Sequence, residues 1–201
     1  MRKTSASGRP RLAALVLAAG GSTRLGRPKQ LVRLRGEPLL IRTCRMASAV
    51  TDGAVIVVLG ADALRLRGLL ERHGNKLTIV HNAAWREGMA GSLRAGLARV
   101  PPGTDGLLIL LVDQARVATA DLVRLVDRWR RHSGRRAAAH YQGRAAVPAI
   151  IPRRLFAALR SLEGDTGARK LLQGLDGLSL VAMPTAAFDI DTPQDVAALQ
   201  N

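Results

Sequence analysis

Three acidic residues stand where apolar runs of the chain end, and carboxylates in such places could bind a divalent cation. Asp113 directly follows the run GLLILLV at 106–112, and Asp189 and Asp191 lie two positions apart near the C-terminus. A carboxylate at the end of a buried strand is costly unless it is ionised and paired, and a hard cation suits it. Residues two apart in an extended strand project from the same face. The sequence therefore predicts a metal site of Asp113 with one of the two C-terminal carboxylates, although Asp191 could instead cap the helix that follows it.

A glycine-rich loop with two basic residues follows the first apolar run. The stretch LAAGGSTRLGRPKQL at 17–31 has the glycine spacing that opens a P-loop, but Arg27 and Pro28 stand where that motif has lysine and then serine or threonine. Glycines let backbone N–H groups approach phosphate oxygens, and Arg24 and Lys29 add positive charge. The loop is predicted to bind phosphate in a way of its own, and a plain glycine turn with surface charges is the alternative.

Polar groups also follow the apolar run LTIVHN at 77–82. A helix is predicted to begin near Ala90 with Ser92 in its first turn, where backbone N–H groups could face an anion or a base. Two other residues nearby favour a structural interpretation. His81 is typical of a strand end, and Trp85 is typical of packing rather than of stacking on a ligand.

These residues are positioned by apolar runs that alternate with longer amphipathic segments. Continuous apolar strands separated by helices are typical of a parallel sheet that is covered on both faces. The predicted strands are 12–18, 54–60, 77–82 and 106–112, and the predicted helices are 38–50, 62–73, 90–99 and 119–132. We expect a three-layer α/β/α sandwich with a mostly parallel, Rossmann-like sheet, whose ligands lie at the carboxyl ends of the strands.

The last third of the chain follows a different pattern. Two extended runs about a turn at Gly143 predict a hairpin. Further elements are predicted to be helices at 153–161 and 167–174, a strand at 178–183, and a last strand and helix within 187–199. Pro38 is expected in the first turn of the first helix, because its missing N–H group would be unpaired there anyway.

The start of the chain allows two interpretations. MRKTSASGRPR followed by LAALVLAA is compatible with a signal peptide and with a leader before a buried strand. Cleavage would destroy the glycine loop, so we expect a disordered leader at 1–10, a single domain at 11–201 and a cytoplasmic protein. No apolar run approaches the roughly 20 residues of a membrane span, and no membrane contact is expected.

The formal charge of +16 raises the question of nucleic acid. The basic residues are mostly arginines scattered along the chain, and aromatic residues make up 2% of it, whereas single-stranded nucleic-acid surfaces need several stacking aromatics. We therefore expect no nucleic-acid partner, and the charge remains compatible with an anionic small substrate. The single cysteine, Cys44, is expected to be a small core residue.

Together these motifs resemble the MobA-like NTP transferase family, which includes the molybdenum cofactor guanylyl- and cytidylyltransferases. LAAGGSTRLGRPKQL matches the family signature LAAGxSxRxGxPKxL without a gap. The resemblance covers almost the whole chain through five further motifs, which are Asn82…Gly88-Met89…Ser92, Asp113-Gln114, Val147-Pro148, Gly164-Asp165-x-Gly167-Ala168-Arg169 and Asp189-Ile-Asp191-Thr-Pro193.

The resemblance implies a fold of the nucleotide-diphospho-sugar transferase type and a defined reaction. A nucleoside monophosphate would pass from an NTP to a phosphorylated acceptor, with release of pyrophosphate. Arg24, Lys29 and Asp113 would be catalytic, with Asp113 and Asp191 as ligands of Mg²⁺, for which Mn²⁺ could substitute. The implied nucleotide-binding residues are Ala18, Ala19, Gly20, Gly21, Ser22, Arg24, Lys29, Asn82, Gly88 and Ser92.

Within the family, LAAG in place of LAGG is more similar to the cytidylyltransferase branch. The implied reaction is transfer of CMP from CTP to the terminal phosphate of molybdopterin, and the product would serve an apoenzyme of the xanthine dehydrogenase type or its chaperone. Arg169 and Lys170 would lie on the acceptor side. The chain departs from the family at Ala115, where relatives often have proline, and at Gly91, where they often have serine.

Two other functions stay open. The chain could use GTP or transfer a nucleotide to another phosphorylated acceptor on the same fold. It could also be a non-catalytic relative that binds nucleic acid or a partner protein. Such a relative would not need Asp113 and Asp191, and both are present.

Overall fold

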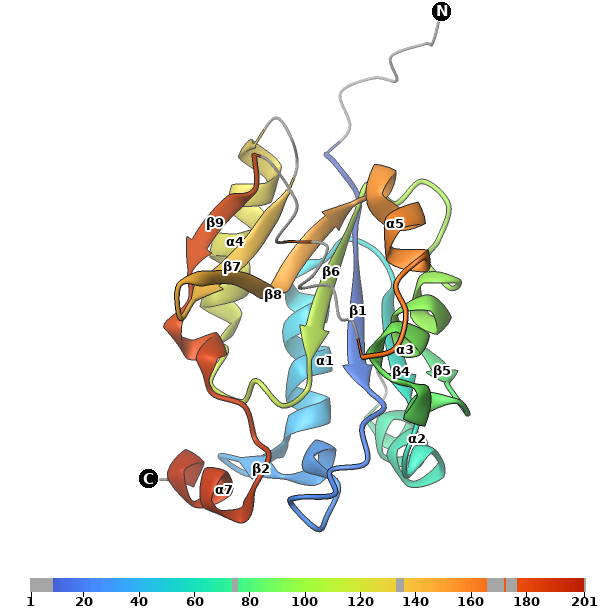
Figure 1. The fold of residues 1–201 in the computed structure, drawn as a ribbon, viewed down its shortest axis with the longest axis vertical. Helices are drawn as coiled ribbons and strands as arrows, with labels where there is room; N and C mark the ends of the chain where they lie inside the picture. Colours follow the sequence, from blue (N-terminus) through green and yellow to red (C-terminus); the bar gives the residue numbers. More distant parts are fainter. Residues whose placement is uncertain (1–8, 74–75, 133–135, 166–171, 173–176, 201) are drawn as a thin grey trace, which may run out of the picture.

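A seven-stranded sheet with helices on both faces forms the centre of the molecule (Figure 1). The computed structural model describes residues 9–73, 76–132, 136–165, 172 and 177–200. The strands, in the spatial order β5-β4-β1-β6-β8-β7-β9, are β1 (Leu12–Ala18), β4 (Val55–Leu59), β5 (Leu77–His81), β6 (Gly106–Leu111), β7 (Ala137–Tyr141), β8 (Arg144–Pro152) and β9 (Ser179–Ala182).

The sheet is mostly parallel, as predicted. β1 pairs in parallel with β4 and β6, β4 with β5, and β7 with β9. Within the described sheet, β8 alone runs antiparallel to its two neighbours, and the turn at Gly143 joins it to β7 as the predicted hairpin. From β1 the chain continues to β4 and β5 on one side and then crosses back to β6 on the other side of β1, so the carboxyl ends of β1 and β6 form the switch point where such sheets bind ligands.

Helices cover both faces of the sheet and confirm the three-layer prediction. On one face the buried side chains belong to α1 (Leu39–Val50), α2 (Ala63–Arg72) and α4 (Thr119–Arg131). On the other face they belong to α3 (Met89–Leu97) and α5 (Phe156–Arg160). The remaining described helices are α7 (Pro193–Gln200) and the short η1 (Lys29–Leu31), η2 (Trp85–Glu87), η3 (Arg153–Leu155) and η4 (Pro184–Ala187).

Strand β1 shows why the apolar runs predict this architecture. All seven of its residues are buried, and alternate residues enter opposite cores: Leu12 and Val16 pack toward α1, whereas Leu15 and Leu17 pack toward α3. A strand between two helical layers has no face left for polar side chains, so its sequence is continuously apolar. Cys44 is fully buried in α1, as predicted, and burial raises the pKa of its thiol to about 12.

Two local predictions are wrong. A hairpin of β2 (Arg33–Leu34) and β3 (Glu37–Pro38) precedes α1, so Pro38 ends a strand and the helix begins at Leu39. No strand forms after 187 in the described chain; η4 leads into a loop that pairs with no sheet edge. Instead the backbone N–H of Ile190 donates to the carbonyl of Asp113 at 3.0 Å, which holds this loop across the end of β6.

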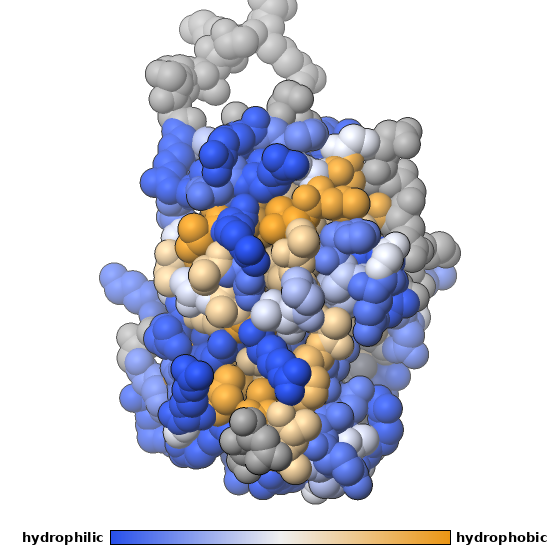
Figure 2. Space-filling view, turned by 90° about the vertical axis from the view of Figure 1, so that its left-hand side faces the viewer, coloured by the Kyte–Doolittle hydropathy of each residue, from blue (hydrophilic) through white to orange (hydrophobic). Residues whose placement is uncertain are grey.

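Three predictions lie wholly or largely outside the described residues, namely the leader at 1–10, the helix at 167–174 and the acceptor-side Arg169 and Lys170. The predicted strand at 178–183 and helix at 153–161 are present as β9 and as η3 with α5. Among the described helices, none has both the length and the apolar character needed to cross a membrane. Figure 2 shows the side of the molecule that carries β9, where hydrophilic side chains cover much of the surface and apolar residues lie exposed between them.

Candidate functional site

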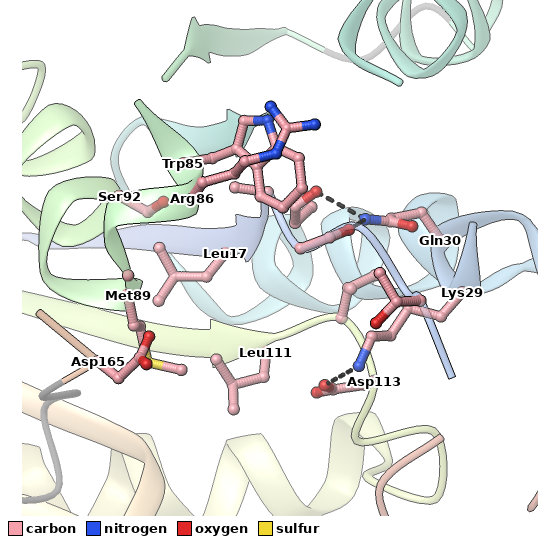
Figure 3. A pocket seen from close by; sticks show the side chains of 16 residues that line it. Leu17, Lys29, Gln30, Trp85, Arg86, Met89, Ser92, Leu111, Asp113 and Asp165 are labelled. Carbon is pink, nitrogen blue, oxygen red and sulfur yellow. Dashed lines mark hydrogen bonds and ion pairs between the residues drawn. The ribbon is translucent and has the colours of Figure 1, made fainter. Parts of the chain in front are cut away.

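A cleft of about 620 Å³ opens at the carboxyl ends of β1 and β6, where the sheet topology predicts a ligand site (Figure 3). Leu17 and Leu111 form part of its floor, and the loop after β1 and the start of α3 form its walls. Of the predicted site residues, those that line the cleft are Ala18, Ala19, Gly20, Lys29, Gly88, Ser92 and Asp113.

At one end of the cleft, Lys29 joins two of the predicted carboxylates. Its ammonium nitrogen donates to Asp113 Oδ2 at 2.8 Å and to Asp191 Oδ1 at 2.9 Å. The other oxygen of Asp191 accepts a hydrogen bond from the guanidinium of Arg24 at 2.9 Å. The Lys29 side chain is only 12% exposed, whereas that of Arg24 is 72% exposed. The four residues Arg24, Lys29, Asp113 and Asp191, which come from three distant parts of the chain, thus form one cluster.

The backbone around Ile190 brings Asp191 to this cluster. Ile190 is fully buried in the core, and its N–H group is bonded to the carbonyl of Asp113. Asp195 then fixes the next turn, because its Oδ2 accepts hydrogen bonds from the N–H groups of Asp191 and Thr192 at 3.0 and 2.7 Å. Thr192 Oγ1 in turn accepts from the N–H of Asp195, so this pair caps α7. The alternative that the Asp191 carboxylate caps the helix is therefore wrong, and that carboxylate faces Lys29.

A third carboxylate, Asp189, interacts with the cluster. Burial by itself would lower the pKa of the Lys29 ammonium, but Asp113 and Asp191 outweigh burial and raise it. The pKa of Asp189 is raised to about 6, first because its carboxyl group is partly withdrawn from water and then by repulsion from Asp113 and Asp191, although the residue as a whole is exposed. Lys29 and Arg144 oppose this rise without cancelling it, so the three carboxylates still repel one another, and a further cation would relieve that repulsion.

The donor set fits a hard divalent cation such as Mg²⁺. Asp113 Oδ1 is buried and has no hydrogen-bond partner among the described residues, while Asp113 Oδ2 and Asp191 Oδ1 converge on one cationic group, the Lys29 ammonium. In the part of the chain that the structure describes, no three His, Cys, Asp or Glu side chains are arranged to hold a metal. A site with two carboxylates suits Mg²⁺, which usually keeps several waters or phosphate oxygens as its other ligands.

Hydrogen bonds that involve two side chains hold the glycine loop in place. Ser22, whose φ is 51°, accepts a hydrogen bond on its Oγ from the N–H of Lys29 at 3.0 Å. Gln30 is 1% exposed, and its Nε2 donates to the carbonyls of Ala18 and Gly20 at 2.8 and 3.0 Å. Sequence reasoning missed Gln30. Its polar side chain directly before the apolar Leu31 was the one signal available.

Trp85 packs against the glycine loop, as predicted, and its ring also forms a wall of the cleft. Its ring packs so closely on the loop that a Cβ atom at Gly21 would lie 2.7 Å from Cη2 of the ring. The same ring lines the cleft, and the guanidinium of Arg86 lies 4.5 Å from its centre (Figure 3). Gly21 therefore lies behind the Trp85 ring rather than on the cleft surface, and its predicted contact with nucleotide stays a prediction.

The start of α3 depends on Gly88. This residue has φ 112°, and a Cβ atom there would lie 2.4 Å from the backbone of Gly164. The carbonyl of Gly164 accepts a hydrogen bond from the N–H of Ala90 at 3.0 Å. This contact brings Asp165 to the cleft beside Met89 (Figure 3), which the linear sequence does not indicate.

Asn82 lies behind the cleft rather than on its surface. Its Oδ1 accepts from the N–H of Ala84 at 3.2 Å, and its Nδ2 donates to Oγ of Ser92 at 3.1 Å. Both side chains are buried, and Ser92 reaches the cleft. Asn82 is thus placed to orient Ser92.

Comparison with known proteins agrees with this geometry. Residues 14–180 match the MobA-like NTP transferase domain. A probable molybdenum cofactor guanylyltransferase of Synechococcus elongatus is 41% identical over 111 residues, which are 55% of this chain and 54% of that protein. A 2-C-methyl-D-erythritol 4-phosphate cytidylyltransferase of Corynebacterium efficiens is 37% identical over 117 residues, 53% of this chain and 45% of that protein. The chain thus spans about half the length of these two relatives.

A solved structure matches over a much larger share of both chains. Rv0371c of Mycobacterium tuberculosis is 32% identical, with a TM-score of 0.78 over 94% of this chain and 97% of that one. The same protein has been crystallised in complex with manganese, and that structure matches with 30% identity, a TM-score of 0.75 and the same two coverages. Since the family match covers most of the chain, this protein belongs to the MobA-like NTP transferase family.

Proposed function

We propose that this protein transfers CMP from CTP to the terminal phosphate of a molybdopterin-type acceptor and releases pyrophosphate. The observation that carries the proposal is the convergence of Lys29, Asp113 and Asp191 at the end of a cleft whose wall is the glycine loop. The relative from Synechococcus supports the acceptor by its name, and the relative from Corynebacterium supports cytidylyl transfer.

In the proposed reaction, an oxygen of the acceptor phosphate attacks the α-phosphorus of CTP. A new P–O–P linkage forms, the bond from the α-phosphorus to the α,β-bridging oxygen breaks, and pyrophosphate leaves with that electron pair. The acceptor phosphate is already an anion near neutral pH, so no side chain has to remove a proton from it. The obstacle is repulsion between two anions, which positive groups must offset.

The chain's own residues would supply most of that positive charge and the alignment. Lys29 and Arg24 are proposed to bind triphosphate oxygens, with N–H groups of the loop at Gly20 and Ser22 as further donors. Asp113 and Asp191 would hold Mg²⁺ or Mn²⁺, which would offset the charge of the triphosphate and align its oxygens. The manganese complex of the mycobacterial relative supports the use of a divalent cation. With both carboxylates engaged in that way, the Lys29 ammonium would be available to phosphate.

Ala19 supports CTP as the donor. It is 7% exposed and lines the cleft next to the glycine loop. A methyl group at this point leaves less room than glycine would, and cytosine is smaller than guanine. The choice of one base over another through a single methyl group is worth roughly 1–3 kcal/mol, so a preference rather than absolute selectivity is expected.

The test measures pyrophosphate release with Mg²⁺, a molybdopterin-type acceptor and each of CTP, GTP, ATP and UTP. Selective release with CTP is expected, and Ala19→Gly should lower the ratio of CTP to GTP turnover by about tenfold. That ratio is independent of the active fraction of a preparation, so it serves as its own control. Selective release with GTP would refute the choice of nucleotide, and nucleotide binding without release would refute the acceptor.

The same cleft would accept a second class of acceptor, another phosphorylated small molecule. The Corynebacterium relative carries that class of substrate in its name. Turnover with a sugar or polyol phosphate but not with molybdopterin would establish this second function. An apoenzyme of the xanthine dehydrogenase type as recipient and a cytoplasmic location remain further parts of the proposal.

A further inference from the structure

A second hollow lies behind the catalytic cluster and shares no lining residue with the cleft. It has a volume of about 570 Å³. Four arginines line it, Arg35, Arg42, Arg45 and Arg116, together with one carboxylate, Glu37. We call it the arginine pocket. Its volume lies within the range of roughly 300–1,000 Å³ that is common for small-molecule sites.

Positive charge in the arginine pocket is largely uncompensated. Glu37 is fully engaged by Arg45, whose Nε and Nη2 donate to its two oxygens at 2.9 and 2.8 Å. Among the residues that the structure describes, no carboxylate forms an ion pair with Arg35, Arg42 or Arg116. The pocket therefore holds three arginine charges beyond the one that Glu37 neutralises.

Two of these guanidinium groups are held in place by the protein. Arg42 is partly buried and donates to the carbonyl of Val117 at 2.7 Å. Arg116 donates to the carbonyl of Ala198 at 3.0 Å, and its guanidinium lies 3.9 Å from the centre of the Phe188 ring. Each arginine has five N–H donors, so most of them remain for a ligand. Arginines oriented in advance in this way bind phosphate at a low cost in side-chain entropy.

The electrostatic environment of Arg42 agrees with an anion site. Burial, followed by repulsion from Arg45 and Arg35, lowers the pKa of Arg42, although Glu37 and Asp121 act in the opposite sense. An anion in the pocket would relieve this repulsion.

The floor of the arginine pocket is apolar, made by Leu34, Ala115, Ala118 and Leu199. The lower part of Figure 2 shows strongly hydrophilic side chains around an apolar area on the side of the molecule that carries α7. A concave surface with an apolar floor and a rim of arginines fits a compact organic phosphate better than it fits an extended polymer, which would need a flat or grooved charged track.

The walls of the pocket continue the segments that carry the catalytic cluster. η1 begins at Lys29 and leads into the β2–β3 hairpin, and the loop from Asp113 leads to Arg116. Asp191 precedes α7, which contributes Leu199. A ligand in the pocket would therefore touch all three segments on the side opposite the cleft.

From this arrangement we infer that the arginine pocket binds a small polyphosphate anion, such as a nucleoside diphosphate or pyrophosphate, at a site separate from the cleft. The inference goes beyond the proposed function and does not depend on which nucleotide or acceptor the cleft uses.

The test titrates the full chain with sodium tripolyphosphate by calorimetry, in EDTA and at physiological ionic strength. Removal of two arginine contacts in the double variant Arg42→Gln/Arg116→Gln should weaken binding at least about tenfold, because charge-assisted hydrogen bonds are lost. The matched control Arg65→Gln/Arg128→Gln removes the same charge from exposed positions on α2 and α4 that do not line this pocket, and it should bind as the wild type does.

A second variant keeps the inference testable if the double variant Arg42→Gln/Arg116→Gln fails to fold. Arg35 lies exposed at the hairpin tip with φ 51°, a conformation that asparagine tolerates, so Arg35→Asn should fold and also lose affinity. Arg24 is proposed to bind triphosphate in the cleft, so Arg24→Gln should weaken any binding there and leave unchanged the affinity of the site that depends on Arg42 and Arg116.

Three outcomes would overturn the inference. Loss of binding in Arg24→Gln but not in the pocket variants would place the anion in the cleft. Equal loss in the Arg65/Arg128 control would assign binding to the overall charge. Displacement of tripolyphosphate by a single-stranded oligonucleotide at much lower phosphate concentration would assign the surface to a polymer. No turnover enters the titration, so its failure is distinguishable from failure of the proposed reaction.

Discussion

The substitution Asp113→Asn separates the proposed metal site from the fold. Asparagine keeps the size of the side chain and removes its charge. In the structure, Asp113 Oδ2 bonds to Lys29, Oδ1 has no partner, and the side chain is 20% exposed. Because no hydrogen bond other than that to Lys29 depends on the carboxylate, we expect a large loss of turnover with little change in the free energy of unfolding.

The expected loss follows from the charge that the site would supply. A metal ion contributes several kcal/mol of transition-state stabilisation, and at about 1.4 kcal/mol per factor of ten a loss of roughly 4 kcal/mol lowers turnover about 10³-fold. The expected change in the free energy of unfolding is smaller than this loss of transition-state stabilisation. Lys29 keeps its bond to Asp191 at 2.9 Å, and the loss of one charge from this largely buried pair costs roughly 1–2 kcal/mol, which reduced repulsion of Asp189 partly offsets.

The assay compares pyrophosphate release with urea denaturation in the same preparation. The matched control is Asp127→Asn, which removes an exposed carboxylate of α4 that lies 3.7 Å from Arg131 and should change neither quantity measurably. Full turnover in a folded Asp113→Asn protein would refute the assigned metal site. A loss of stability of several kcal/mol together with turnover would instead show that Asp113 holds the fold.

Three further predictions concern positions around the site. Gly88→Ala should destabilise the protein by at least about 2 kcal/mol in urea denaturation, because its backbone conformation and the contact with Gly164 exclude a Cβ atom, whereas the control Gly91→Ala meets only an ordinary contact and should not. Gln30→Leu removes two hydrogen bonds to loop carbonyls and should raise the KM for nucleotide about tenfold with a smaller effect on kcat; an unchanged KM would refute its positioning role. Burial raises the pKa of the Cys44 thiol from its ordinary value of 9.0 to about 12, so stability should fall as pH rises from about 9 to about 12, by up to about 1.4 kcal/mol per pH unit, and Cys44→Ala should lack this slope.

The sheet could be predicted because burial on two faces leaves a strong mark on the sequence. β1, β4 and β6 are continuous apolar runs that end where polar loops begin. The stretch at 187–191 has a pattern that wrongly predicts a strand. Phe188 and Ile190 alternate with carboxylates, as residues do in a half-buried strand. In the structure Ile190 is fully buried, and its backbone N–H bonds to the carbonyl of Asp113 rather than to a sheet edge in the described chain. The β2–β3 hairpin has two residues in each strand, too few for any periodicity to show.

The cluster of Lys29, Asp113 and Asp191 could be foreseen because parallel strands end at one edge of the sheet, so charged residues after different strands meet there. Gln30 and the contact of Gly88 with Gly164 could not be foreseen in the same way. They depend on which carbonyl or backbone segment lies opposite, and residues far apart in the chain decide that. The charged residues of the cleft can thus be predicted from the sequence, whereas the packing contacts that shape its walls mostly cannot.

The choice between Asp189 and Asp191 shows how a neighbouring feature resolves what periodicity leaves open. Two carboxylates on either side of Ile190 are equivalent to an argument from strand geometry. They differ because Asp195 and Thr192 cap α7 and fix the backbone at Asp191, whose carboxylate bonds to Lys29, while Asp189 keeps a raised pKa. A capping pair three residues apart, T-P-Q-D, is visible in the sequence, so the same reasoning can be applied before a structure is known: of two candidate ligands, the one that directly precedes a capped helix has the more fixed position.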